Sequence, residues 1–162
     1  MDEYKRYLFR EQVTKTLGLP EIEQSKDSLE IRVWWQGAMY NPKSIWVIGG
    51  RFDSLKARRI DYYPNYNTGK MDSIRIVELR PKAGGWADYF RSINFASFWG
   101  MPRYYQLGKG RECVDGETVT IEAFDGRRYK TLSYPCYTLY RDSSFYNRFS
   151  SVAERLMALE RD

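Results

Sequence analysis

The segment Leu29-Glu-Ile-Arg-Val-Trp-Trp-Gln36 decides the fold class, because its hydrophobicity alternates with a period of two. Leu29, Ile31 and Val33 are each followed by a charged residue or a tryptophan, which is the pattern of a half-buried strand. Three further strands are predicted after it, over Ser44–Ile48, Ser54–Tyr63 and Ser73–Arg80. The gaps between these segments have the length of turns, whereas parallel crossovers need longer connections. The sequence therefore favours an antiparallel meander.

A β-hairpin is predicted around Asp125-Gly126, between the segments 118–124 and 127–133. A three-residue loop with a glycine bulge would place Ile121 opposite Tyr129 and Glu122 opposite Arg128. A two-residue turn would instead place Ile121 opposite Lys130, which suits the two faces of the hairpin less well.

Helices are predicted over Glu3–Leu17, over Trp86–Ile93 and near the C-terminus. The last helix has the clearest pattern, an apolar stripe in steps of four, three, four and three residues, made of Phe145, Phe149, Val152, Leu156 and Leu159. The chain thus reads as a single α+β domain over residues 1–162. We expect a mostly antiparallel sheet of about six strands, a meander plus a hairpin, with helices packed on one face.

The composition excludes several classes of chemistry. The 162 residues include no histidine and two cysteines, so His-dependent nucleophilic catalysis, His-containing zinc sites and four-cysteine metal sites are ruled out. We expect no cofactor and no metal. An acidic cluster before and within the hairpin leaves open a histidine-independent carboxylate hydrolase; its members are Glu112, Asp115, Glu117, Glu122 and Asp125. Asp-Gly turns and solvated strand positions explain the same residues more simply.

The N-terminus and the hydropathy predict a cytoplasmic protein that does not enter the membrane. Charged residues begin at the second position, so we expect no signal peptide, and the longest uncharged run, between Arg91 and Arg103, has eleven residues. A removed leader replaced by Met would leave the same sequence, so export stays open. In a cytoplasmic protein, Cys113 and Cys136 are expected to be free thiols.

A basic and aromatic segment suggests a second function class, a single-stranded nucleic-acid binding module. Cations beside tyrosines that can stack on bases are what such a site requires. The residues are Lys56, Arg58, Arg59, Tyr62, Tyr63, Tyr66 and Lys70. The net charge of +5 agrees with this function, but the basic excess is spread evenly over both halves of the chain.

Residues 85–160 resemble small uncharacterised bacterial α+β proteins. The resemblance rests on Phe98-Trp99-Gly-Met-Pro102, on Asp115 to Gly126, on Arg128-Tyr129, on Pro135 and on the closing apolar helix. Proteins of this size and layout include immunity proteins, which neutralise a toxin by binding it. The resemblance implies no catalytic residue. It directs attention to Glu122, either as a buried ion-pair partner of Arg128 or Lys130 or as a pocket carboxylate.

A non-catalytic protein-binding protein is the leading hypothesis, because catalytic motifs are missing and 17% of the residues are aromatic. The expected contact surfaces are the loop from Tyr62 to Thr68 and the segment Phe95–Trp99. The candidate binding residues are Tyr62, Tyr63, Tyr66, Arg58, Arg59, Phe98, Trp99 and Glu122. The sequence leaves the oligomeric state open.

Overall fold

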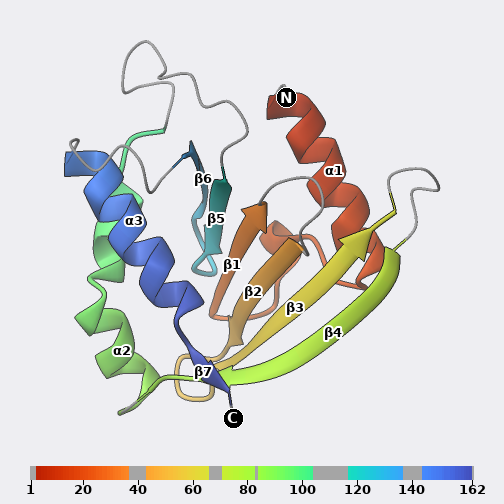
Figure 1. The fold of residues 1–162 in the computed structure, drawn as a ribbon. Coiled ribbons are helices and arrows are strands. Elements are labelled where there is room, and N and C mark those ends of the chain that lie inside the picture. Colours follow the sequence, from red (N-terminus) through yellow and green to blue (C-terminus); the bar gives the residue numbers. More distant parts are fainter. Residues whose placement is uncertain are drawn as a thin grey trace.

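A computed structural model describes residues 3–36, 43–65, 71–82, 84–103, 117–136 and 144–161. These residues form a seven-stranded sheet in the order β6-β5-β1-β2-β3-β4-β7, and every neighbouring pair is antiparallel (Figure 1). The strands are β1 (Leu29–Gln36), β2 (Lys43–Gly50), β3 (Lys56–Pro64), β4 (Met71–Arg80), β5 (Thr118–Phe124), β6 (Tyr129–Pro135) and β7 (Glu160–Arg161). The predicted α+β class, meander and hairpin are confirmed.

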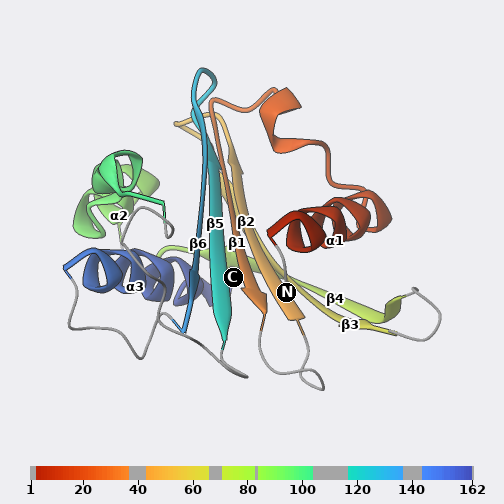
Figure 2. The ribbon, with the colours of Figure 1, turned by 90° about the horizontal axis from the view of Figure 1, so that it is seen from above.

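Helices lie on both faces of this sheet (Figure 2). The helical segments are α1 (Glu3–Thr16), the 3-10 turn η1 (Ile22–Gln24), α2 (Trp86–Ser92), the 3-10 segment η2 (Phe95–Gly100) and α3 (Ser144–Met157). α2, η2 and α3 pack on one face, as predicted, whereas α1 covers the other. The reason is the position of β1, which pairs with β2 on one side and β5 on the other. Such a central strand has two faces to bury, and Trp34, on its second face, is as buried as Val33 on its first.

The larger apolar core lies between the sheet and α3. The predicted stripe of this helix is buried at Phe149, Val152, Leu156 and, just beyond its end, Leu159, while Phe145 at its start is exposed. The Phe149 ring stacks on Tyr134 of β6 with ring centroids 4.3 Å apart. A regular apolar spacing thus predicted both the helix and the surface that it buries.

The hairpin register differs from the prediction. Ile121 lies opposite Leu132, and Phe124 opposite Tyr129, so the loop holds the four residues Asp125–Arg128. Directly opposed residues point to the same face of an antiparallel pair. The observed register sends Ile121 and Leu132 together into the core under α3, where the predicted register would have turned Leu132 to the other face. Burial of Leu132 therefore excludes the three-residue loop; the two-residue turn would also have kept Leu132 on the core face, opposite Val119, but the observed pairing differs from it as well.

In the part of the chain that the structure describes, no helix has both the length and the hydropathy needed to span a bilayer.

Candidate functional site

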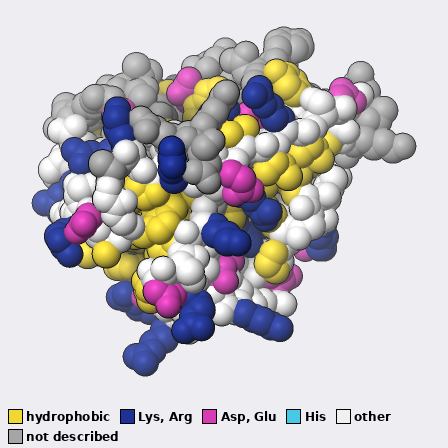
Figure 3. Space-filling model, turned by 90° about the horizontal axis from the view of Figure 1, so that it is seen from below, with side chains coloured by type: hydrophobic (Ala, Val, Ile, Leu, Met, Phe, Trp, Pro, Cys, Tyr) yellow, Lys and Arg dark blue, Asp and Glu magenta, His cyan; other side chains and the backbone are white. Residues whose placement is uncertain are grey.

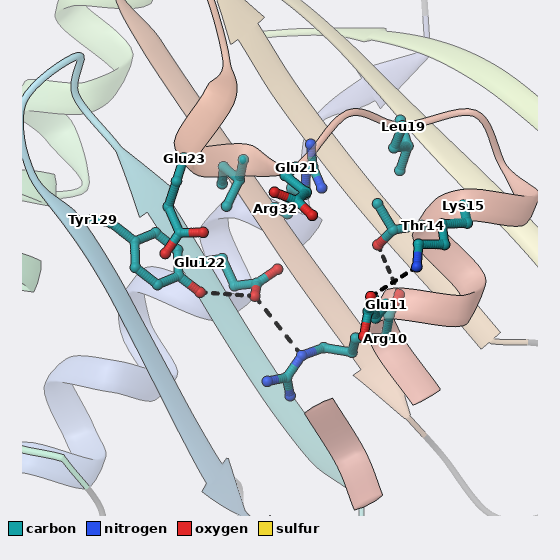
Figure 4. Close-up of a pocket in the computed structure, with 11 residues that line it drawn as sticks. Arg10, Glu11, Thr14, Lys15, Leu19, Glu21, Glu23, Arg32, Glu122 and Tyr129 are labelled. Atoms are coloured by element: carbon teal, nitrogen blue, oxygen red, sulfur yellow. Dashed lines mark hydrogen bonds and ion pairs between the residues drawn. The ribbon is translucent and has the colours of Figure 1, made fainter. Parts of the chain in front are cut away.

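A pocket of about 110 Å³ lies where α1 and the connection after it meet the sheet (Figure 4). The helix contributes one wall, the connection around η1 the rim, and strands β1, β5 and β6 the floor. The lining residues are Arg10, Glu11, Thr14, Lys15, Leu19, Glu21, Ile22, Glu23, Arg32, Glu122 and Tyr129.

Glu122 is the buried acid of this pocket. One carboxylate oxygen accepts a hydrogen bond from the Trp34 indole N–H at 2.6 Å, and the other accepts one from the Tyr129 hydroxyl at 3.1 Å. The Arg10 Nε lies 3.8 Å from that second oxygen. Glu122 is thus both the pocket carboxylate and the ion-pair partner that the sequence suggested, but its cation comes from α1.

The cations proposed from the sequence are held elsewhere. Arg128 forms a two-pronged ion pair with Asp125 at 2.7 and 2.8 Å, which closes the hairpin loop. The Lys130 ammonium donates to the backbone carbonyls of Trp99 and Met101 on the opposite face of the sheet. Register explains the difference, because Lys130 shares a face with Leu132 and not with Glu122.

Arg10 is buried with an unsatisfied donor. Its side chain is 9% exposed, and its Nε–H has no hydrogen-bond acceptor among the described residues. A separation of 3.8 Å from Glu122 gives charge attraction but is too long for a hydrogen bond. A buried donor left without an acceptor costs about 1–3 kcal/mol. Arg10 would therefore be stabilised by an additional hydrogen-bond acceptor.

The other pocket cations already have acidic partners. Arg32, almost fully buried on β1, is paired with Glu30 and also donates to the carbonyl of Pro20 at 2.6 Å. Lys15 pairs with Glu11 one helical turn earlier, at 2.8 Å. The contact between Arg32 and Pro20 ties the chain after α1 to the sheet and so fixes the rim of the pocket.

Tyr129 supplies a protonated hydroxyl. Burial and, after it, the neighbouring Glu122 carboxylate raise the pKa of Tyr129 well above its ordinary value. The phenol therefore remains a donor to Glu122 at physiological pH.

The pocket has few features of a hydrolytic site. Of its four lining acids, Glu122 is buried, whereas Glu21 and Glu23 are exposed. No group of three or more potential ligands among the described residues is arranged to hold a metal ion. Glu112 and Asp115, the other acids considered for catalysis, lie outside the described residues.

The basic and aromatic residues of β3 are divided between the two faces of the sheet. Arg58 and Tyr62 share the α1 face, and Tyr62 is buried there; Arg59 and Tyr63 share the other, and Tyr63 is exposed. Tyr66 and Lys70 lie outside the described residues. On the described part of the face in Figure 3, basic and acidic side chains are interspersed around apolar areas. The continuous basic and aromatic surface that a nucleic-acid site would need is not formed by Arg58, Arg59, Tyr62 and Tyr63.

The second predicted contact segment belongs mainly to the core. Phe95 and Phe98 are buried, and their rings stack with centroids 5.3 Å apart. Trp99 is partly exposed, with the Arg128 guanidinium 4.4 Å from the centre of its ring. The prediction of Phe98 and Tyr62 as surface residues has to be corrected: Tyr62 lies on the sheet face that α1 covers, and Phe98 of η2 packs into the core between the sheet and α3.

An exposed apolar area that the sequence analysis missed lies on β4. Ile74 and Ile76 are 48% and 56% exposed, and both point to the same face of the strand. Among the described residues, the outer edge of β4 pairs only at Leu79 and Arg80, with β7. The sequence did not show which outer strand of the meander would pair with the hairpin: the hairpin pairs with β1, and among the described residues this leaves most of the outer side of β4 without a strand beside it.

Cys136, directly after β6, is disulfide-bonded. This contradicts the expectation of free thiols. The other cysteine of the chain, Cys113, lies outside the described residues.

No family model matches this sequence, and neither a curated protein nor a solved structure is significantly similar to it.

Proposed function

We propose that this protein is a non-catalytic protein-binding protein that takes up an extended segment of its partner along the free edge of β4. The observation that carries this proposal is the edge itself: a ten-residue strand whose outer side, among the described residues, is paired at two positions only. Unpaired N–H and C=O groups along such an edge form a ready template for another strand.

The side chains of β4 support a specific contact. Exposed edge strands in soluble proteins usually carry charges or prolines, which prevent uncontrolled pairing. Here the exposed Ile74 and Ile76 sit in the middle of the strand, with the acid Glu78 on the same face and the exposed acid Asp72 at the irregularity near the start of the strand. A complementary segment would place apolar side chains beside the isoleucines and basic side chains at its ends.

The more specific form of this proposal is an immunity protein whose partner is a toxin. Its support is the resemblance of residues 85–160 to small bacterial α+β proteins, together with a site that binds without catalytic groups. The nucleic-acid and hydrolase alternatives have no comparable observation in their favour.

The disulfide also supports a proposal about the compartment. Disulfides persist in oxidising compartments and are rare in the cytoplasm. The bonded Cys136 therefore favours a partner met outside the reducing cytoplasm, in place of the cytoplasmic location expected from the N-terminus.

The experiment compares two substitutions of exposed apolar residues. Ile76→Lys places a charge on the β4 edge, whereas Phe52→Lys makes the same kind of change in the turn between β2 and β3. Partners are isolated from the source organism with the wild-type protein, purified, and titrated against all three proteins by calorimetry. Hydrogen exchange then follows the β4 amides.

We expect protection of the β4 amides in the complex, an affinity reduced by about tenfold or more for Ile76→Lys, and no change for Phe52→Lys. Equal affinity for both variants would contradict the β4 surface. Capture of nucleic acid in place of protein would contradict the function class, and self-association of the wild type through β4, seen by sedimentation, would replace the foreign partner by a second copy.

A further inference from the structure

We propose that the pocket beneath α1 binds a small polyhydroxylated ligand without negative charge, a sugar or an amino sugar, with one hydroxyl seated between Arg10 and Glu122. This site is independent of the β4 edge: it is built from α1, the η1 connection, β1, β5 and β6.

The first step of the argument is the gap between the two charged groups. Arg10 Nε and Glu122 Oε1 are 3.8 Å apart, and both side chains are about nine-tenths buried. An oxygen atom held about 2.8 Å from each would bridge them at hydrogen-bond distance, and because Arg10 Nε is closed off from solvent, the Arg10 side chain has to shift as the oxygen enters. It would give Arg10 the acceptor that it lacks among the described residues.

The second step concerns the chemistry of that oxygen. It must accept from a guanidinium and donate to a carboxylate, which a hydroxyl can do. An ionised carboxylate cannot donate and would be repelled by Glu122. Glu122 has capacity for this bond, because a carboxylate offers about four acceptor positions and the Trp34 and Tyr129 donors use two.

The third step is the charge around the opening. Arg32 and Lys15 are already paired with Glu30 and Glu11. The exposed acids Glu21 and Glu23 then leave the rim negative, so a neutral or cationic ligand is favoured and an anion disfavoured. The partly exposed ring of Tyr129 offers an apolar face to a sugar ring.

The test uses three probes that share one ring: glucose, glucosamine and glucuronate. The Trp34 indole N–H, hydrogen-bonded to Glu122 at 2.6 Å, is a built-in reporter for nuclear magnetic resonance, and its signal can be assigned with Trp34→Phe. Each probe is titrated to high millimolar concentration into the wild type, into Arg10→Met, which keeps the buried stem and removes the donor, and into Arg51→Met. The last variant loses the same charge at an exposed, remote position.

We expect saturable shifts of the Trp34 signal with glucose or glucosamine, none with glucuronate, and loss of the shifts in Arg10→Met but not in Arg51→Met. A response to glucose and glucosamine alike identifies a neutral sugar site, and a response to glucosamine alone identifies an amino sugar site. Equal shifts with all three probes, shifts that survive Arg10→Met, or no shift at all would overturn the proposal and leave a bridging water between Arg10 and Glu122. If Arg10→Met does not fold, Glu122→Gln takes its place: it keeps acceptor capacity but removes the charge, and it should weaken binding.

Discussion

The helices on the two faces of the sheet are attached by different kinds of contact, apolar on one face and partly polar on the other. α3 contributes an uninterrupted apolar stripe, with Phe149, Val152 and Leu156 buried against the strands. On the opposite face, α1 buries Val13 together with the polar residues Arg10 and Thr14. Apolar packing fills space without gaps, whereas charged contacts need partners at defined distances and leave room where these are missing. The pocket therefore lies under α1 and not under α3.

The largest expected effect is the loss of stability when a buried leucine is replaced by alanine. This loss should differ between the two faces of the sheet. Leu156→Ala, in the stripe of α3, should lower the free energy of unfolding by about 2–5 kcal/mol, because it opens a cavity in close-packed core. Leu19→Ala, next to the pocket on the α1 side, should cost less, because the space already opens to solvent there. Urea unfolding of both variants measures the difference, and equal losses would contradict it.

The next effect concerns the end of β6. Replacing the disulfide-bonded Cys136 by Ala should destabilise the protein by about 2–4 kcal/mol, the usual contribution of a native disulfide. Thermal unfolding with and without reductant provides the comparison. The wild type should lose stability on reduction, and the variant should not respond. Alkylation of two thiols in the unreduced, unfolded wild-type protein would show that the bond does not form.

A smaller effect is expected from the polar contacts of the α1 face. Glu122→Gln removes the counter-charge of Arg10 while keeping an acceptor for Trp34, and should cost about 1–3 kcal/mol, because a buried cation loses its partner. The double variant Arg10→Met/Glu122→Gln should recover part of that loss. Strict additivity in this double-mutant cycle would show that the two side chains do not interact.

The smallest effect appears at alkaline pH. Burial raises the pKa of Tyr134, on the α3 face, to about 12, compared with about 10 in an unfolded chain. Below pH 10 the phenol is protonated in both states and its contribution is complete. As the pH rises from about 10 to about 12 the unfolded state releases its proton first, so stability falls. Tyr134→Phe should flatten this decline in urea unfolding at pH 9 and pH 11.5; an unchanged slope would assign the decline to other groups, such as Tyr129.

The strands of the meander could be predicted because the alternation of apolar and polar residues along a strand is visible in the sequence itself. The segment Leu29–Gln36 is a strand with the predicted bounds, and the stripe of α3 packs as expected. The site could not be predicted in the same way. Glu122 was recognised as a residue of interest, but Arg10 lies more than a hundred positions earlier in the chain, and nothing local to either residue indicates that they meet.

Local pattern thus determined the elements, the α+β class and the absence of histidine chemistry, since these depend on composition and on periods of two or about four residues. Tertiary structure decided which face α1 covers, the register of the β5–β6 hairpin, the burial of Tyr62 and Phe98, and the open edge at β4. Each of these depends on which strand lies beside which. β1 lies in the middle of the sheet because β5, which is far away in the sequence, pairs with its free side. A local sequence pattern does not contain this information.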